Sequence, residues 1–443
     1  MEKLFHLKEH GTTVRTEIVG GLTTFFAMAY IIFVNPSILS NTGMPFGGVF
    51  FATCIAAAIG CLLTAFLANV PFAQAPGMGL NAFFAFTVCA SWGMGYTWQE
   101  GLAIVLISGI LFLIVAISPL RGKIISAIPS SLKAAISVGI GLFIAMIGLL
   151  NSGTGIVKLD AANNITALNF VGEAGLNSAA ILTLIGLLIT SFLMAWKVKG
   201  AIFIGIVVTT LIGIPMGVTQ LPEKLWDASM LSTETVFALD FHGLFSKGIL
   251  PLITAVIVFA ICDCFDTVGT LIGTAGNCGM LDKDGNLPKG DKALIADAVA
   301  TCAGACMGTS TVTTFVESSA GISEGARTGL HSVVVGVLFL LALVLSPLAG
   351  IIPGAATAPA LIIVGVLMMK SAVNIDWSDI EIAIPAFLTI AMMPFAYSIS
   401  DGIGFGFISF TLIKMVRGKF KEVPVLMYVL SALFVAMYVL KFM

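Results

Sequence analysis

Charged side chains are scarce in this chain of 443 residues: only 10% of them are Asp, Glu, Lys or Arg, whereas 58% are hydrophobic. The mean hydropathy of +1.08 leaves too little polar surface to cover a water-soluble globule of this size. The formal net charge is −2, so the chain lacks the basic excess with which nucleic-acid-binding proteins neutralise phosphates. We therefore expect a membrane protein that does not bind nucleic acid.

Metal-binding and nucleotide-binding patterns are also missing. The four histidines are scattered, and most of the eight cysteines lie in apolar runs, where cysteine acts as a small hydrophobic residue. The phosphate-binding pattern G-x-x-x-x-G-K-[ST] does not occur. No nucleophile, metal set or cofactor motif accompanies the paired acids described below, so we predict no metal, no cofactor and no enzyme.

Apolar runs of membrane-spanning length dominate the sequence. They lie near 18–38, 48–68, 99–117, 132–150, 178–196, 201–217, 249–274, 291–307, 328–350, 357–371, 380–397, 402–416 and 424–441. Two further stretches, 72–90 and 309–325, are rich in Gly, Ser, Thr or Pro, which is typical of broken helices that line a cavity. Residues 380–416 form either two spans or one hairpin of half-spans, and both alternatives stay open.

The basic residues predict the orientation of the chain in the membrane. If the segments alternate, Lys3, Lys8 and Arg15 fall on the same side as the basic residues at 121–133 and 197–199. Basic loops prefer the cytoplasm. The first apolar run has no small-residue cleavage site, so it is expected to be a retained helix. We expect a multi-pass protein of the inner (cytoplasmic) membrane with a cytoplasmic N-terminus.

A weak internal repeat relates the two halves of the chain. S-P-L-R-G at 118–122 returns as S-P-L-A-G at 346–350, an offset of 228 residues. An odd number of apolar segments lies between the two copies, so equivalent helices would run in opposite directions. The same offset carries the broken stretch 72–90 onto 300–318, next to the second broken stretch. Broken helices in equivalent positions predict a substrate site near the bilayer midplane.

The first broken stretch places an amide near a helix start. Pro76, Gly77 and Gly79 favour extended backbone before a helix that begins near Leu80. Asn81 would then lie in the first turn, where its amide offers a donor and an acceptor to a heterocycle. A helix cap without ligand contact is the alternative. The nearby Phe83 is a candidate for stacking on a flat ring.

The run 249–274 carries Asp263, Asp266, Thr267 and Thr270 at spacings that share one helical face. An ionisable group in hydrocarbon is costly unless it faces a cavity or a partner, so this face is expected to line the site. Two carboxylates this close are not both expected to be charged and unpartnered. We expect Asp263 to bind substrate and Asp266 to hold hydrogen-bond donors of the protein, with Thr267 and Thr270 in support. A purely structural cap or salt bridge is the alternative.

The second broken stretch contributes a further carboxylate. Thr311, Thr313 and Phe315 alternate as in a short strand, and Glu317 follows where a half-helix would begin, near its positive dipole end. Glu317 is predicted to accept hydrogen bonds from ring N–H groups and to carry a proton. Phe315 is the second stacking candidate. Asp297 is interpreted as structural, with Thr or backbone partners.

Four sequence blocks together resemble the nucleobase-cation symporter-2 superfamily, and within it the AzgA-like adenine, guanine and hypoxanthine permeases. They are G-L-T-T-F-F-A-M-A-Y-I-I-F-V-N-P at 21–36, A-P-G-M-G-L-N-A-F-F-A-F at 75–86, D-C-F-D-T-V-G-T-L at 263–271 and T-F-V-E-S-S-A-G-I at 314–322. The resemblance extends over essentially the whole chain. Related xanthine and urate carriers typically have Gln or Glu followed by Asn, one residue and Gly; here Ser318-Ser319-Ala320-Gly321 follows Glu317, which disfavours those substrates.

The resemblance implies an all-α polytopic membrane protein with fourteen transmembrane segments in two inverted repeats of seven. Short strands would precede the half-helices of segments 3 and 10. The implied parts are a core domain from 18–117 and 245–350 and a gate domain from 118–217 and 351–443, each containing one piece of each repeat. Fourteen segments favour the hairpin alternative for 380–416.

The resemblance also implies the activity. It implies proton-coupled import of a purine nucleobase by an elevator-type movement, often as a homodimer in the lipid membrane. The purine contacts would fall on Asn81, Asp263 and Glu317, with Asp266 needed nearby. A xanthine- or uracil-type carrier and an anion carrier of related fold are the alternatives; acids without a basic residue repel anions, which disfavours the second.

Overall fold

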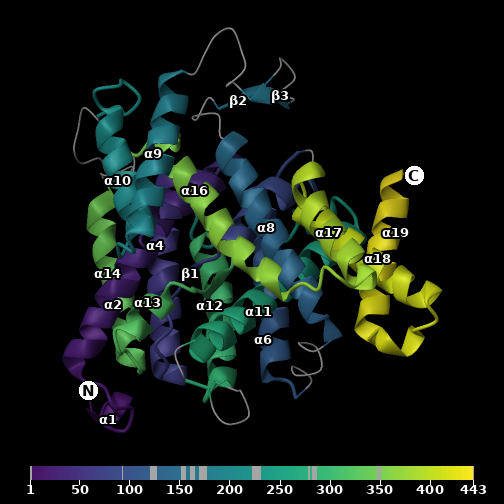
Figure 1. The fold of residues 1–443 in the computed structure, drawn as a ribbon, viewed down its shortest axis with the longest axis horizontal. Helices are drawn as coiled ribbons and strands as arrows, with labels where there is room; N and C mark the ends of the chain where they lie inside the picture. Colours follow the sequence, from purple (N-terminus) through teal and green to yellow (C-terminus); the bar gives the residue numbers. More distant parts are fainter. Residues whose placement is uncertain are drawn as a thin grey trace.

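The computed structural model describes the whole chain except residues 1, 92, 120–126, 151–155, 160–164, 169–176, 222–230, 278–279, 282–286, 347–350 and 443 (Figure 1). Its elements up to residue 213 are α1 (Glu2–Phe5), α2 (Val14–Met28), α3 (Ile31–Leu39), α4 (Phe46–Leu63), β1 (Gln74–Pro76), α5 (Met78–Phe83), α6 (Trp98–Ile117), α8 (Ser130–Leu150), β2 (Val157–Leu159), β3 (Ile165–Leu168), α9 (Ser178–Ala195) and α10 (Ala201–Gly213). The later elements are α11 (Ile249–Asn277), α12 (Gly290–Met307), β4 (Val312–Thr314), α13 (Ser318–Ser323), α14 (Gly329–Ala342), α16 (Gly354–Met368), α17 (Ile380–Phe395), α18 (Ile399–Val416) and α19 (Val425–Phe442).

The helices are apolar enough for a bilayer. Among the described residues, eight helical segments have the length and hydropathy to cross a membrane, and five shorter apolar helices accompany them. Hydrocarbon offers no hydrogen bonds, so helices that satisfy their own backbone groups are the favoured spanning structures. This confirms the predicted all-α polytopic class. The repeat residues 120–122 and 347–350, and the basic residues Arg121 and Lys123, lie outside the described part.

Two short strands interrupt the helical pattern where the sequence predicted broken helices. β1 pairs antiparallel with β4, and Gln74 lies opposite Thr314. The Gly77 N–H donates to the Thr311 carbonyl at 3.0 Å, and the Phe315 N–H donates to the Ala73 carbonyl at 3.0 Å. Each extended segment thereby satisfies backbone groups of the other, as extended chain away from water requires. The half-helices α5 and α13 follow directly, so two breaks far apart in sequence meet at one place.

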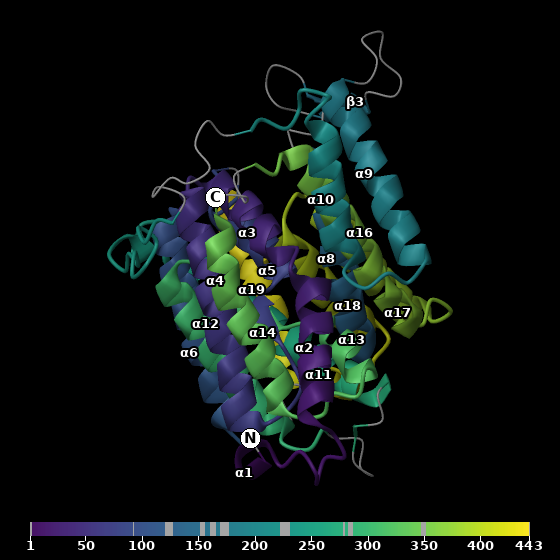
Figure 2. The ribbon, with the colours of Figure 1, turned by 90° about the vertical axis from the view of Figure 1, so that its left-hand side faces the viewer.

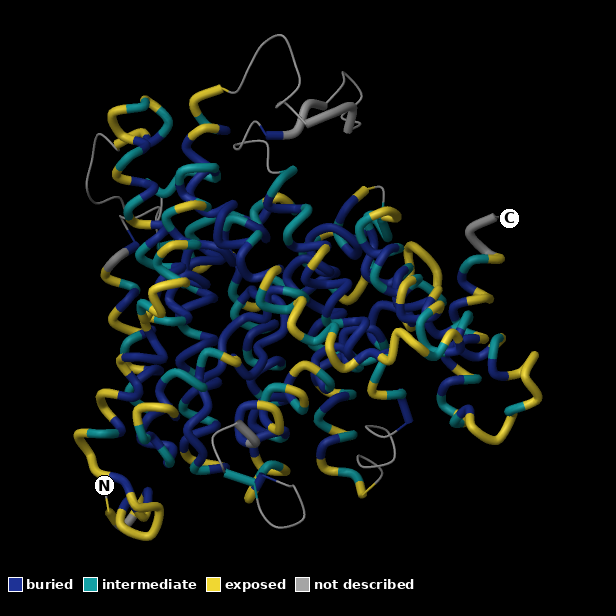
Figure 3. Tube along the Cα trace, in the orientation of Figure 1, coloured by how far each residue is buried: buried dark blue, intermediate teal, exposed yellow. Residues whose placement is uncertain are grey.

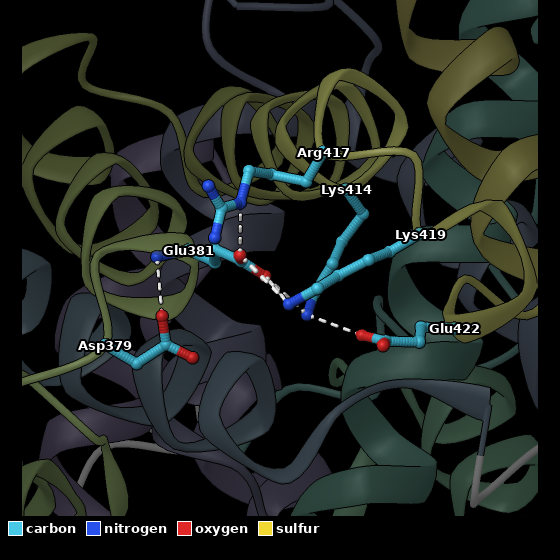
Figure 4. Close-up of polar contacts among 6 residues, drawn as sticks. All are labelled: Asp379, Glu381, Lys414, Arg417, Lys419 and Glu422. Carbon is cyan, nitrogen blue, oxygen red and sulfur yellow. Dashed lines mark hydrogen bonds and ion pairs between the residues drawn. The ribbon is translucent and has the colours of Figure 1, made fainter.

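The stretch 380–416 folds as two helices joined by a short turn, here called the helical hairpin, and α18 has by itself the length and hydropathy of a membrane span. The turn 396–398 joins α17 to α18, and Glu381 at the start of α17 binds residues at and beyond the end of α18. The helices therefore run antiparallel. Lys414 and Arg417 each reach the Glu381 carboxylate, at 2.9 and 2.8 Å, and Lys419 joins them at 2.8 Å (Figure 4). One carboxylate thus ties both ends of the hairpin together.

The helices pack in two sets. In one set α2, α4, α6, α12 and α14 contact one another, and β1 and β4 lie among them; in the other, α8 packs against α16 and α17, and α9 packs against α10 and α16. Figure 2 shows the second set beside the first, with α9, α16 and α17 at its outer side. Buried residues fill the middle of the described part, and exposed ones lie at its rim (Figure 3).

Candidate functional site

The centre of the site is a buried carboxylate that ties the two strands to a helix. Asp297 on α12 is fully buried and accepts three side-chain hydrogen bonds. The donors are Gln74 Nε2 on β1 at 3.1 Å, Thr314 Oγ1 on β4 at 2.9 Å and Thr267 Oγ1 on α11 at 2.8 Å. A buried carboxylate needs such partners. The threonine partners expected for Asp297 are present.

Asp263 is also held by the protein. It lies on α11 with only 1% of its surface exposed, and its Oδ2 accepts a hydrogen bond from Thr301 Oγ1 on α12 at 2.8 Å. Among the described residues, its Oδ1 has no hydrogen-bond partner. Thr301 also accepts from the Val312 N–H, so Asp263 is linked to β4 through this hydroxyl. In this conformation Asp263 supports the strand.

Asp266, one helical turn further along α11, is the accessible carboxylate of the pair. Its residue is exposed, and its Oδ2 accepts from Thr313 Oγ1 on β4 at 3.3 Å. The sequence-based expectation had Asp263 facing the substrate and Asp266 holding hydrogen-bond donors of the protein. Asp266 does hold such a donor, Thr313, but it is the more exposed of the two carboxylates, because Thr301 of α12 covers Asp263. Thr270 follows on α11 and is half-buried.

Glu317 lies where the sequence predicted, at the start of α13, and is half-buried. Tyr30, between α2 and α3, donates its hydroxyl proton to Glu317 Oε1 at 2.7 Å. Tyr30 is 2% exposed and within electrostatic range of both Glu317 and Asp266. Glu317 and Asp266 are also within electrostatic range of each other. The structure therefore groups Glu317 with Asp266 and Tyr30, and leaves Asp263 on the buried side of the strand.

Asn81 is fully buried on α5. It does not cap the helix, because Gly77 occupies the N-cap position without a side-chain hydrogen bond. Its Oδ1 accepts a hydrogen bond from Ser310, immediately before β4, whereas Nδ2 has no hydrogen-bond partner in the described part of the chain. Nδ2 of Asn81 is thus available to donate a hydrogen bond to another group. Asn81 reaches the second broken stretch, as the prediction of one shared site requires.

The two candidate stacking residues differ in their surroundings. Phe83 is fully buried and packs edge-on against Phe259 of α11, with ring centroids 4.7 Å apart. Phe315 is 6% exposed and directly follows β4, two residues before Glu317. Phe83 therefore serves the packing of α5 on α11 in this conformation. Phe315 is the one that lies close along the chain to an accessible carboxylate, Glu317.

Sequence reasoning did not assign a role to several polar residues of the site. They are Tyr30, Gln74, Thr301 and Ser310. Tyr30 stands in an apolar run, and its partner Glu317 is 287 residues away, so no local pattern reports the contact. Gln74 could have been identified from the sequence, because it lies two residues before Pro76 in the broken stretch.

The donor set is not that of a metal centre. Among the described residues, no group of three or more His, Cys, Asp or Glu side chains is arranged to hold a metal ion. The polar lining instead combines carboxylates, hydroxyls and amides. Such groups bind a neutral polar molecule through hydrogen bonds and can exchange protons with it.

Sequence comparison relates the chain to permeases over its whole length. A putative permease of Methanocaldococcus jannaschii is 46% identical over 439 residues, covering 99% of this chain and 98% of the relative. The guanine/hypoxanthine permease PbuO of Bacillus subtilis is 45% identical, covering 97% and 98%. The adenine permease AdeP of Escherichia coli is 40% identical, covering 98% and 95%.

Structure comparison finds the same fold in more distant transporters. The transmembrane domain of the cyanobacterial bicarbonate transporter BicA has a TM-score of 0.64 at 14% identity, covering 90% of this chain and 96% of the other. SLC26A9 has a TM-score of 0.66 at 12% identity, covering 91% of this chain and 66% of the other. At such identities the likeness concerns the fold. Residues 15–405 match the permease family, and with these full-length relatives the chain belongs to that family as a multi-pass membrane transporter.

Proposed function

We propose that this protein imports purine nucleobases, namely adenine, guanine or hypoxanthine, together with protons. The observation that carries the proposal is the hydrogen bond from Tyr30 to Glu317, with Asp266 within electrostatic range of both side chains, at paired strands from opposite halves of the chain. Two accessible carboxyl groups deep among apolar helices suit a planar base with several N–H donors. The relatives named as guanine/hypoxanthine and adenine permeases support the purine class.

The acids also suit proton coupling. A carboxylate that accepts a substrate N–H can take up a proton instead, so substrate and proton occupancy become linked at one group. A proton that moves through 100 mV releases about 2.3 kcal/mol, enough to concentrate a neutral base by a factor of tens. We assign this role to Glu317 first and Asp266 second. Asp263, Thr267 and Thr270 are proposed to support the carboxylates and strands.

Asn81 is proposed as the amide that recognises the base. Its unpartnered Nδ2 is a donor that could meet a ring nitrogen or a 6-oxo group once the buried amide becomes accessible. Phe315 is proposed to stack on the base, with Phe83 behind it. These contacts require movement of α5, because Asn81 and Phe83 are fully buried in the present conformation.

We further propose an elevator-type mechanism with a core domain of 18–117 and 245–350 and a gate domain of 118–217 and 351–443. The packing of α2, α4, α6, α12 and α14 in one set and of α8, α9, α10, α16 and α17 in another supports this division. The strands and Asp297 belong to the first set, and α11 and α13, which carry Asp266 and Glu317, pack against α6 and α2 of that set, so we expect the carboxylates and strands to move as one body. A cytoplasmic N-terminus, the inner membrane and a homodimer complete the proposal, in line with the basic residues of the loops and the family resemblance.

An anion transporter is the second candidate, because BicA and SLC26A9 share the fold. Fold likeness does not transfer a substrate. The accessible side chains here are Asp266 and Glu317, which repel an anion when ionised. A xanthine- or uracil-type carrier differs from the main proposal only in the base that is bound.

An uptake competition panel tests the proposal. Uptake of radiolabelled adenine and guanine into cells that express the protein is challenged with unlabelled adenine, guanine, hypoxanthine, xanthine, uracil and sulfate. We expect the first three to compete and a protonophore to abolish accumulation. Competition by sulfate alone would favour the anion carrier, and accumulation that resists the protonophore would refute proton coupling.

A further inference from the structure

Tyr30 has one hydroxyl proton, and it gives that proton to Glu317 Oε1 at 2.7 Å. The hydroxyl oxygen retains only lone pairs, so toward any second partner it is an acceptor. A hydrogen bond to a carboxylate is among the stronger ones and fixes its orientation. Tyr30 is 2% exposed, which leaves the ring little freedom to turn away. Tyr30 therefore holds Glu317 and offers no donor to a substrate.

The hydroxyl protons of the threonines around Asp266 can be assigned in the same way. Thr267 gives its only proton to Asp297 Oδ2 at 2.8 Å. The contact between Thr267 and Thr313, at 3.0 Å, must then use the proton of Thr313. That same proton is the one that reaches Asp266 Oδ2, at 3.3 Å. Since Thr313 shares one proton between two acceptors, Asp266 is incompletely satisfied and remains an acceptor.

The accessible polar edge formed by the Glu317 and Asp266 carboxylates, with the buried Tyr30 hydroxyl bound to Glu317, thus accepts hydrogen bonds and does not donate them while the acids are ionised. Lys133 on α8 is positioned over the ring of Phe265 on α11, with its Nζ 4.9 Å from the ring centroid. The amide of Asn81 supplies the side-chain N–H donor proposed for the base, and this donor suits a 6-oxo group.

Guanine and hypoxanthine share the 6-oxo group and N1–H. They differ in the 2-amino group, which gives guanine two adjacent N–H donors on one edge.

We propose that Tyr30 is a positioning residue that fixes the Glu317 carboxylate within this hydrogen-bond-accepting edge, so that the site prefers guanine over hypoxanthine. The inference rests on the proposed purine transport and adds the basis of its selectivity. An additional hydrogen bond to an ionised carboxylate predicts about tenfold tighter binding of guanine. Without the Tyr30 hydroxyl, the Glu317 carboxylate can rotate, and its fixed orientation relative to Asp266 is lost.

Equilibrium binding of radiolabelled guanine and hypoxanthine to the purified protein in detergent tests the inference. We expect the wild type to prefer guanine about tenfold, and Tyr30→Phe to reduce that ratio to about twofold or less while the thermal unfolding temperature changes little. Tyr96→Phe is the matched control, because Tyr96 is also 2% exposed but its hydroxyl has no hydrogen-bond partner among the described residues. It should keep the wild-type ratio.

The outcomes separate the two claims. If the wild type binds neither base, the proposed function fails. If the wild type binds both bases but shows no preference for guanine, the inference is wrong. This outcome is measured on the wild type alone. If the preference exists but survives in Tyr30→Phe, Tyr30 does not set it. A lowered unfolding temperature with an unchanged ratio would reduce Tyr30 to a packing role.

Discussion

Lys199 and Glu324 form an ion pair that joins the turn before α10 to the end of α13. α10 belongs to the proposed gate domain and α13 to the proposed core domain. The side chains are 55% and 32% exposed, so water screens the pair. A groove of about 440 Å³ between α2 and the start of α10 lies beside it. The contact between the two sets of helices is therefore loose here and suited to separate.

Reversing one charge of this pair should alter the transport rate. Lys199→Glu or Glu324→Lys replaces attraction by repulsion and shifts the equilibrium away from the present conformation. Because exposed pairs contribute up to about 1 kcal/mol, we expect a change of no more than about fivefold in the initial rate of uptake. The double reversal should restore the wild-type rate. Lys197→Glu, at an exposed neighbouring lysine, is the control, and an equal effect there would show that local charge alone matters.

Thr314→Val should destabilise the protein without removing any apolar contact. The change deletes the hydroxyl that donates to Asp297 Oδ1 at 2.9 Å. We expect a loss of about 1 to 2 kcal/mol, measured by thermal unfolding in detergent. Thr64→Val is the matched control, because the Thr64 hydroxyl is buried without a partner in the described part of the chain. Equal destabilisation by both variants would mean that the bond to Asp297 contributes nothing.

The two short strands of the site could be predicted from local sequence patterns. Pro76, Gly77 and Gly79 predicted extended backbone before a half-helix, and alternating Thr311 and Thr313 predicted a second short strand; both are present. Local rules suffice there because the backbone preferences of proline and glycine act within a few residues. The pairing of the two strands was not predicted; in the structure it satisfies backbone groups of both segments away from water.

The difference in burial between Asp263 and Asp266 could not be predicted in the same way. Residues three apart on a helix point in directions that differ by about 60°, so both fall on one broad face. Which carboxylate is covered depends on Thr301 of a different helix. Tyr30 escaped prediction for a similar reason, since a tyrosine in an apolar run is usually a packing residue and only the fold brings Glu317 to it.

Glu381→Gln should loosen the helical hairpin. The carboxylate binds Lys414, Arg417 and Lys419, so the neutral amide leaves three cations without their shared counter-charge. We expect a lower unfolding temperature and faster proteolysis in the segment after α18. Glu422→Gln is the control, because Glu422 is 54% exposed and pairs with Lys414 alone. A control variant as unstable as Glu381→Gln would argue against a central role of Glu381.

Asn81→Ala should weaken purine binding. The change removes the unpartnered Nδ2 donor and the acceptor of the Ser310 hydroxyl. We expect about tenfold weaker binding in an equilibrium measurement. Ser310→Ala separates the two effects, because it removes the partner of Asn81 and keeps the amide donor. If both variants bind purine as the wild type does, Asn81 serves only the packing of α5.

Glu317→Gln should uncouple transport from the proton gradient. Glutamine keeps the size of the side chain and an oxygen that accepts from Tyr30, but it does not take up a proton in place of the carboxylate. We therefore expect loss of accumulation against a gradient, while exchange of external for internal purine persists at a reduced rate. The measurements are concentrative uptake and counterflow in proteoliposomes. Glu234→Gln, at an exposed glutamate before α11, should retain both activities. Undiminished accumulation in Glu317→Gln would move the coupling role to Asp266, the other accessible carboxylate of the site.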